Sequence, residues 1–507
     1  MVTLDEIADL GLLQKPSSKA PEPLERSDSS YKSLGSFALE KDRQYQQQFA
    51  DIYFLRLTKI KPALEQIASK AWKGTIISGE TAKQVERVLD VRQGELCWVT
   101  GTVYMDMPLK PNILEDVSKD RWISAPPSAK KYYSEDGSDA VMLEDDSGRI
   151  RLIGDILKNH LLVTGCIIAA IGTENANGEF DVIDLRFADL APQPKRWELT
   201  KQIPGRKDED EDVDMADSPS PSSSGQGSKK IAIVSGLEFP GSDTSYTVEL
   251  NLLLEYLLGE ALDPSAQKEV AQISRLIIAG NSIGAEQKPL AAEDTTEKRA
   301  HKKYGYDSST YDPVPSNLFD DFLSELLPTM PVTLLPGALD PANSSYPQQP
   351  IHAAMFPNSR SYISLPGSGE PGWLDTVTNP WEGEVEGWRV LGTGGQNLDD
   401  MFKYIDSDDR LGMMEAMCRY RCSAPTAPDT LWSYPFQEDE PYIMKQCPHL
   451  YFVGSQPEFG TRVIEGPDKQ MVRLVLVPSF SGTREIVLLD METLDVTKVK
   501  IATVSSL

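Results

Sequence analysis

The chain has 507 residues and a formal net charge of −27, with 40% hydrophobic and 25% charged residues. This length exceeds one ordinary hydrophobic core, so at least two domains joined by linkers are expected. A chain this acidic is not expected to bind DNA strongly by itself, because nucleic-acid affinity comes mainly from Lys and Arg that neutralise phosphates. An acidic surface suits a basic protein partner instead.

The five cysteines are scattered along the chain, which argues against a disulfide framework and for a reducing compartment, nuclear or cytosolic. The longest nearly apolar stretch, Leu161–Gly172, is too short to cross a bilayer, and no apolar leader opens the sequence. We therefore expect no membrane association.

The N-terminal region divides into a tail and a helix. Residues 1–35 are rich in Ser, Pro, Lys and Glu, which predicts a mobile tail. Within residues 36–75, apolar side chains recur at helical spacing from Lys41 to Trp72, with an interruption at Pro62. This pattern predicts an amphipathic helix that buries one face within the chain.

Residues 76–204 consist of short apolar runs separated by turn-forming residues. The predicted strands are Cys97–Asp106, Ala140–Leu143, Ile150–Leu152, Leu161–Gly172 and Phe180–Phe187. This arrangement is typical of a small Greek-key barrel of the OB type. Such barrels often bind single strands through a basic groove. Residues 76–200 hold 14 Lys and Arg against 21 Asp and Glu, so a structural or protein-docking role is favoured here.

Residues 205–228 begin with an acidic run and continue with Ser and Pro, with almost nothing to bury. This composition predicts a disordered linker. Ser218 and Ser220 each precede a proline, which makes them candidate sites of proline-directed phosphorylation.

From 229 to 507, apolar strands alternate with helical stretches, which predicts a layered α/β domain with a largely buried sheet. The predicted helices are Val248–Leu262, Pro315–Leu327 and Leu398–Cys422. The last part is rich in predicted strands, namely Val472–Val477, Glu485–Leu489 and Val496–Ile501.

Five short turns in this region, four of which contain glycine, have the spacing of the metal-binding turns of a metallophosphoesterase. They are Ser235–Glu238, Gly280–Gly284, Gly337–Asp340, Thr378–Pro380 and Gly454–Pro457. An active enzyme of this type places Asp, His and Asn at such strand ends to hold two metal ions. Here the spacing is kept without those residue types, which points away from catalysis and toward a scaffold.

The remaining candidate ligands do not complete a metal site. Asp340 is the one carboxylate at the end of the third turn, and a single acid cannot hold two cations. The four histidines lie away from the turns, and we interpret each as structural: His160, His301, His352 and His449. We expect no catalytic residue, no metal and no cofactor.

The segment Pro425–Leu431, followed by Tyr434–Phe436 and Cys447–Gly454, resembles the signature of the B subunits of replicative DNA polymerases. These B subunits are the small, regulatory subunits of the polymerases. The similarity covers roughly residues 40–500. The N-terminal helix and the segment Gln348–His352 are most similar to the delta branch of that family.

The resemblance implies an α+β multi-domain fold. It consists of an N-terminal helix and an OB-fold β-barrel, followed by a layered α/β calcineurin-like phosphoesterase domain that lacks its metal ligands. Eukaryotic members of the family are inactive. Mapped onto this chain, the family's ligand positions are degenerate, and they are Gly236, Glu238, Asn281, Gly284, Ala338, Leu339, Ser455 and Pro457.

The resemblance also implies a function. The chain is expected to be a non-catalytic accessory subunit in the nucleus that supports DNA replication and repair. It would bridge the C-terminal cysteine-rich domain of the catalytic subunit of DNA polymerase delta and a third accessory subunit. The sliding clamp would be an indirect partner, and polymerase zeta is a further candidate partner. The interface residues are not indicated by the sequence.

Two other interpretations stay open. The chain could be an active metal-dependent phosphodiesterase or nuclease, against which the lost ligands argue. It could also be a single-strand nucleic-acid-binding protein that acts through its barrel, against which the acidic composition of the barrel argues.

Overall fold

The computed structural model describes most of the chain, namely residues 24–40, 49–77, 79–111, 131–196, 228–240, 246–260, 263–284, 313–363 and 372–501. Ser218, Ser220, His301 and nearly all of the predicted linker 205–228 lie outside these ranges. Within the described ranges, no helix is both long and apolar enough to cross a membrane.

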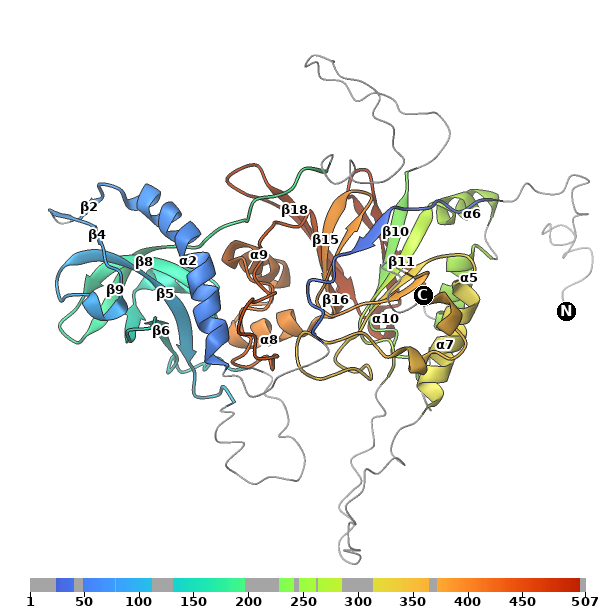
Figure 1. Cartoon of the computed structure of the whole chain (residues 1–507), viewed down its shortest axis with the longest axis horizontal. Coiled ribbons are helices and arrows are strands. Elements are labelled where there is room, and N and C mark those ends of the chain that lie inside the picture. Colours follow the sequence, from blue (N-terminus) through green and yellow to red (C-terminus); the bar gives the residue numbers. More distant parts are fainter. Residues whose placement is uncertain are drawn as a thin grey trace, which may run out of the picture.

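A closed β-barrel forms the first domain (Figure 1). Its strands are β5 (Leu96–Asp106), β6 (Ala140–Glu144), β7 (Arg149–Ile153), β8 (Ile167–Glu174) and β9 (Glu179–Arg186). They pair in the order β5-β6-β7-β9-β8, and β8 pairs back onto β5. β7 and β9 run parallel and the other pairs of the barrel antiparallel, as in a five-stranded Greek-key OB barrel. The predicted barrel is therefore confirmed.

Short elements precede the barrel in the chain. They are β2 (Ile76–Ile77), β3 (Glu80–Thr81) and β4 (Lys83–Gln84). β2 and β3 form a small hairpin, while β4 pairs with β5 beside the barrel.

The predicted strand Leu161–Gly172 is wrong in its first half, because β8 begins only at Ile167. Gly165 interrupts the run with a φ of +90°, a left-handed conformation that does not continue a strand. A Cβ at this position would lie 2.1 Å from the carbonyl oxygen of Pro425. Glycine therefore turns the chain here and lets the second domain approach the barrel closely.

The helix α2 (Ala50–Trp72) packs on the barrel. Its buried face recurs every three or four residues and includes Leu57, Ile60 and Leu64. The predicted interruption at Pro62 is wrong, because the helix continues through it. Pro62 and Thr58 both lie on the exposed face, so water can serve the Thr58 carbonyl that loses its intrahelical donor.

Two sheets of six strands each build the second domain (Figure 1). The first has the order β13-β12-β11-β10-β19-β20. Its strands are β10 (Lys230–Val234), β11 (Ile273–Ala279), β12 (Val332–Leu335), β13 (Leu374–Thr376), β19 (Glu485–Asp490) and β20 (Val496–Lys500). The second has the order β1-β14-β15-β16-β18-β17. Its strands are β1 (Tyr31–Ser33), β14 (Trp381–Val385), β15 (Trp388–Thr393), β16 (Leu450–Gln456), β17 (Gly460–Glu465) and β18 (Met471–Pro478).

Helices cover the outer faces of both sheets, so the predicted layered α/β domain is confirmed. They are α5 (Thr247–Leu258), α6 (Pro264–Val270) and α7 (Val314–Leu326) on the first sheet, and α8 (Gln396–Tyr404) and α9 (Arg410–Tyr420) on the second, with the short α10 (Phe480–Thr483) between β18 and β19. Along β10, Ile231 and Ile233 face the core between the sheets, whereas Ala232 and Val234 face the core under α5 and α7. Burial on both faces explains why these strands read as continuous apolar runs.

The predicted mobile tail over residues 1–35 is wrong for its described part. Tyr31–Ser33 forms β1, which pairs antiparallel with β14 at the edge of the second sheet. The Arg26 guanidinium donates hydrogen bonds to the carbonyl oxygens of Leu257 at 2.7 Å and Ile273 at 3.0 Å. A three-residue strand whose partner lies far along the chain leaves no local periodicity from which to predict it.

The predicted single helix Leu398–Cys422 is also wrong, since α8 and α9 are separate helices. The side chain of Asp409 accepts a hydrogen bond from the backbone N–H of Gly412 at 2.9 Å and so caps the start of α9. An Asp at this position favours a new helix start over continuation of α8. Cys422 lies beyond the end of α9, and its backbone forms an isolated antiparallel β-bridge with Ile443.

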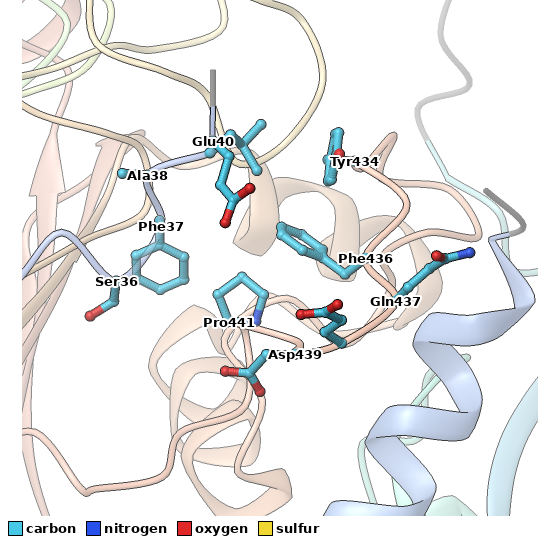
Figure 2. Close-up of a pocket in the computed structure, with 11 residues that line it drawn as sticks. Ser36, Phe37, Ala38, Glu40, Tyr434, Phe436, Gln437, Asp439 and Pro441 are labelled. Atoms are coloured by element: carbon cyan, nitrogen blue, oxygen red, sulfur yellow. The ribbon is translucent and has the colours of Figure 1, made fainter. Parts of the chain in front are cut away.

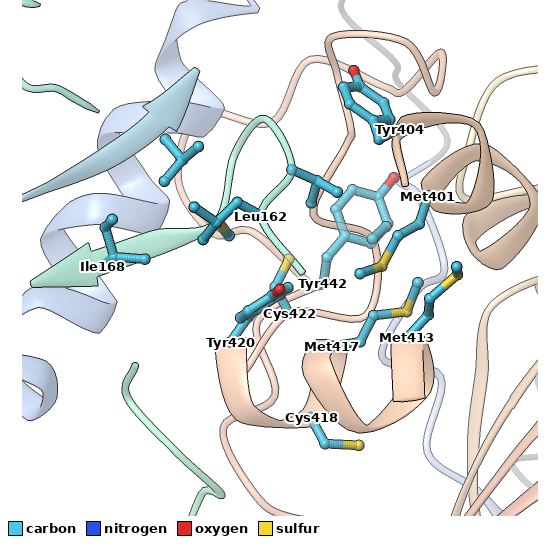
Figure 3. Packing of buried hydrophobic residues seen from close by; sticks show 14 of the residues in the cluster. Leu162, Ile168, Met401, Tyr404, Met413, Met417, Cys418, Tyr420, Cys422 and Tyr442 are labelled. Atoms are coloured by element: carbon cyan, nitrogen blue, oxygen red, sulfur yellow. The ribbon is translucent and has the colours of Figure 1, made fainter. Parts of the chain in front are cut away.

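One continuous apolar core joins the barrel to the second domain. Figure 3 shows this cluster extending from Ile168 and Leu162 of the barrel domain, past Tyr420 and Tyr442, to Met401 of α8 and Met413 and Met417 of α9. A shared core of this kind makes relative motion of the two domains costly, because separation would expose apolar surface to water.

A buried ion pair lies beside this core. Arg56 of α2 and Glu440 are both fully buried, and the Arg56 Nε atom donates to the two carboxylate oxygens of Glu440 at 2.9 and 3.2 Å. The other guanidinium nitrogens donate to the carbonyl oxygens of Gly165 at 3.1 Å, Pro425 at 2.6 Å and Ala427 at 2.9 Å. One side chain of the helix therefore binds the barrel and the second domain together.

Replacement of Arg56 by Met should destabilise the protein by about 3–5 kcal/mol, because Glu440 would remain buried without its cation. Urea unfolding followed by tryptophan fluorescence measures this effect. Lys59→Met is the matched control one turn along the same helix, since Lys59 pairs with the exposed Asp439. The control should cost less than about 1 kcal/mol. Equal unfolding midpoints for the two variants would contradict the role assigned to Arg56.

Candidate functional site

The turns that resemble a metallophosphoesterase site meet at one place between the two sheets. β10, β11 and β12 run parallel, so the turns that follow them lie side by side. The backbone N–H of Gly236 donates to the carbonyl oxygen of Gly280 at 2.9 Å. β16 of the second sheet brings Ser455 to the same place, where its Oγ atom lies 3.2 Å from the Oγ atom of Ser235.

Ser235, Asn281 and Ser455 link three of the turns by side-chain hydrogen bonds. The Asn281 amide donates to the Oγ atom of Ser455 at 2.9 Å, and its oxygen accepts from the backbone N–H of Leu339 at 3.0 Å. The Ser235 hydroxyl donates to the carbonyl oxygen of Ala279 at 2.6 Å and accepts from the backbone N–H of Ser455 at 2.7 Å. The polar groups at these turns therefore bind one another.

A second cluster consists of three neutral amides around the turn at Asn379. The Asn379 amide nitrogen donates to the side-chain oxygens of Gln348 at 3.0 Å and Gln396 at 2.9 Å. Its oxygen accepts from the backbone N–H of Gly394 at 2.9 Å. The nitrogen of Gln396 donates to the oxygen of Gln348 at 2.7 Å, and that of Gln348 donates to the carbonyl oxygen of Gly337 at 3.0 Å. The fourth turn is thus tied to the third.

Asp340 is buried, and both oxygens of its carboxylate accept hydrogen bonds from backbone N–H groups. One oxygen accepts from the backbone N–H groups of Ser282 and Ile283, both at 2.8 Å, and the other accepts from Gly337 at 2.7 Å. Burial raises the pKa of Asp340 to about 6, while these backbone hydrogen bonds oppose the shift. The carboxylate fixes the second turn against the third.

The other sequence-predicted positions have backbone or surface roles. Gly236 adopts a φ of +61°, and a Cβ there would lie 2.3 Å from the Oγ atom of Ser479. Gly284 donates its backbone N–H to the carbonyl oxygen of Phe239 at 3.1 Å. Three residues are exposed, namely Ala338 and Leu339 in the middle of the third turn and Pro457 at the end of the fifth.

Three of the turns place a non-glycine residue in the left-handed region. They are Glu238 at φ +45°, Asn281 at +53° and Ser455 at +55°. Such conformations cost energy for residues with a Cβ and collect at functional sites. The backbone here therefore has a strained geometry, and the side chains of Asn281 and Ser455 bind each other.

The residues of these turns do not fit a pair of bound cations. Glycine, alanine, leucine and proline offer no side-chain donor, and the amides and hydroxyls already bind one another. Among the described residues, no group of three or more His, Cys, Asp or Glu side chains lies close enough together to hold a metal ion. Three of the four histidines fall in the described ranges, away from the turns.

These three histidines have structural contacts. His449 accepts from the backbone N–H of Arg389 through Nδ1 at 3.1 Å, and burial lowers its pKa to about 4. His352 accepts from the backbone N–H of Ala354 at 3.2 Å, and His160 packs on the ring of Phe187.

The sequence did not reveal the roles of Gln348 and Gln396. Both lie outside the five turns, and Gln396 is at the edge of a glycine-rich segment. Glutamine is also not a usual metal ligand. In the sequence, Gln348 is notable only as part of the segment Gln348–His352 that carries the family resemblance, and its burial, with 3% exposed, is seen only in the structure.

A methyl group at Gly454 should be enough to disturb this assembly. The Cβ atom of Gly454→Ala would lie 2.1 Å from the carbonyl oxygen of Ala279 and 2.6 Å from the Oγ atom of Ser235. We expect a loss of about 2–3 kcal/mol in the free energy of unfolding, measured by urea titration. Gly482→Ala is the control, because no described atom outside its own helical turn and its chain neighbours lies within 4 Å of its Cβ position. A Gly454→Ala protein as stable as this control would contradict the packing of the turns.

Each of the two domains matches the model of a known protein family. The family model described as DNA polymerase delta subunit OB-fold domain matches residues 48–185, which include α2 and the barrel strands up to β9. The family model for the B subunit of DNA polymerases alpha and epsilon matches residues 231–461, which include the turns.

Whole-length relatives agree with these matches. The DNA polymerase delta small subunit of Saccharomyces cerevisiae is 32% identical, over 94% of this chain and 93% of the relative. The protein of the same name from Arabidopsis thaliana is 33% identical, over 93% and 95%. The DNA polymerase delta subunit 2 of Drosophila melanogaster is 30% identical, over 93% and 97%. The similarity therefore covers the whole architecture.

Proposed function

The chain belongs to the family of DNA polymerase delta small subunits, and we propose on that basis that it is a non-catalytic accessory subunit of a replicative DNA polymerase in the nucleus. The observation that supports a non-catalytic role most directly is the set of turns where amides and hydroxyls bind one another. A hydrolase needs open coordination positions and a bound nucleophile at such a place. We infer that the second domain is a calcineurin-like phosphoesterase domain without activity.

The proposed role is to bridge other subunits. One partner is the C-terminal cysteine-rich domain of the catalytic subunit of polymerase delta, and the other is a third accessory subunit. The shared core and the Arg56–Glu440 ion pair support this role, because they hold two domains in one fixed arrangement. A fixed arrangement lets partners on different faces keep a constant separation. The sliding clamp would be reached through these partners, and polymerase zeta is a further proposed partner.

Two alternatives are weaker. An active metal-dependent phosphodiesterase or nuclease would need ligands at positions where Gly236, Ala338 and Pro457 stand. A single-strand binder acting through the barrel would need a basic, aromatic groove, whereas residues 76–200 carry more acidic than basic side chains.

The full-length protein should neither bind nor use manganese. Calorimetric titration with MnCl2 should show no saturable binding, because the turns lack a complete donor set. Hydrolysis of bis-p-nitrophenyl phosphate in the same buffer should match the rate without protein. Turnover that rises with protein concentration would revive the phosphodiesterase interpretation.

Co-expression tests the bridging role. The full chain should co-purify at moderate salt with the C-terminal cysteine-rich domain of the catalytic subunit of polymerase delta. Separate co-expression with the third accessory subunit should also give a stable pair, and all three should form one complex. Failure of the catalytic-subunit domain to associate would contradict the main proposal.

A further inference from the structure

A hollow of about 400 Å³ lies where the N-terminal segment meets the loop before β16. It is lined by Ser36–Glu40 on one side and by Tyr434 to Pro441 on the other. Figure 2 shows Phe37, Phe436 and Pro441 around it, with the carboxylate of Glu40 directed between them. None of the residues that line the hollow belongs to the five turns.

The aromatic wall of this hollow is held in place by one buried residue. Tyr442 is fully buried and its hydroxyl lies 2.8 Å from the Oγ atom of Ser433. The ring of Phe37 stacks on Tyr442 with centroids 6.3 Å apart, and the ring of Phe436 meets Tyr442 edge-on at 5.8 Å. Tyr434 in turn packs edge-on against Phe436 at 5.1 Å. The rings are therefore fixed before any ligand binds, which lowers the entropy cost of binding.

The charged groups at the hollow are all acidic. Glu40, Glu438 and Asp439 line it, and no Lys or Arg is among the lining residues. Asp439 is neutralised by ion pairs with Lys59 and Lys445. Glu40 and Glu438 are exposed, and within the described ranges neither carboxylate has a hydrogen bond or ion pair. Two negative charges thus stand beside an aromatic wall, and no cation of the described residues pairs with them.

The aromatic rings and the two carboxylates indicate which kind of ligand would fit the hollow. The described residues offer no set of three acidic, His or Cys ligands for a metal ion, so the complementary cation is an organic one. A guanidinium group stacks on aromatic faces and pairs with carboxylates through the same planar fork, which an ammonium group does less well. Trp432, 63% exposed, lies two residues before Tyr434 in the same segment of the chain.

We propose that this hollow is a docking site for an extended segment of another polypeptide that carries arginine next to apolar residues. The arginine side chain lies against the partly exposed ring of Phe436 and pairs with Glu40 and Glu438. Flanking apolar residues cover the partly exposed ring of Tyr434. This inference goes beyond the subunit role, and the two can fail separately.

Fluorescence anisotropy with the full-length protein tests the proposal. The probe is a fluorescein-labelled peptide, Gly-Pro-Arg-Leu-Arg-Pro-Gly, and its control carries citrulline in place of both arginines, which removes the charge and keeps the shape. We expect saturable binding of the arginine peptide at low salt and at least fivefold weaker binding of the citrulline peptide, roughly the effect of two exposed ion pairs. Addition of NaCl to 0.5 M should weaken the binding, because these carboxylates are solvent-exposed.

Glu40→Gln/Glu438→Gln tests the location. Both residues are exposed, so the variant should fold normally and bind the arginine peptide about fivefold more weakly. Glu86→Gln/Glu95→Gln is the matched control, which removes two exposed carboxylates from the barrel domain and should leave the affinity unchanged. Absence of saturable binding, as in a hollow filled by another part of the chain, would overturn the proposal. So would equal affinity for the citrulline peptide, or equal losses in the two double variants.

Discussion

The arrangement of the two domains depends on the buried guanidinium of Arg56. It makes hydrogen bonds to groups from three parts of the chain: the carboxylate of Glu440, the carbonyl oxygen of Gly165 in the barrel, and the carbonyl oxygens of Pro425 and Ala427 in the second domain. Burial raises the pKa of Glu440, and the charge of Arg56 opposes that shift. Neither charge could be buried without the other, so helix, barrel and second domain are specified together.

The interface tolerates no side chain at Gly165, whose missing Cβ leaves room for the Pro425 carbonyl group. The segment that starts at Pro425 is the same one that carries the motif typical of polymerase B subunits. Its local sequence is therefore explained in part by the contacts that join the domains, and not by chemistry on a substrate. Around it, apolar residues of α8, α9 and the barrel complete a single core.

In the turns between the sheets, too, polar side chains form contacts within the protein. In a metal-dependent hydrolase, polar side chains at such strand ends point at cations. Here Ser235, Asn281 and Ser455 bind one another, and Asn379 is held between Gln348 and Gln396. Asn281 and Ser455 have left-handed backbone conformations, which are costly and collect at functional sites. Such strain at turns without metal ligands supports the proposal of an inactive phosphoesterase domain.

Much of the fold could be predicted from the sequence, because strands buried on both faces give continuous apolar runs, as at Ile231–Val234. The errors have local causes. Pro62 lies on an exposed helix face, Asp409 starts a new helix, and β1 depends on a partner far along the chain. At the site, the positions of the turns were predictable from glycine spacing, whereas the roles of Gln348 and Gln396 depend on contacts between distant segments. Arg56 gave no signal either, since a helical arginine is usually exposed.

The central claim is that the turns are closed by their own hydrogen bonds and serve as structure. Anomalous diffraction at the manganese edge, from crystals grown in millimolar MnCl2, tests it most directly. The account predicts no anomalous peak among the five turns, with the Asn281 amide still bonded to the Ser455 hydroxyl. Two peaks about 3.5–4 Å apart at the ends of β10, β11 and β12 would contradict it.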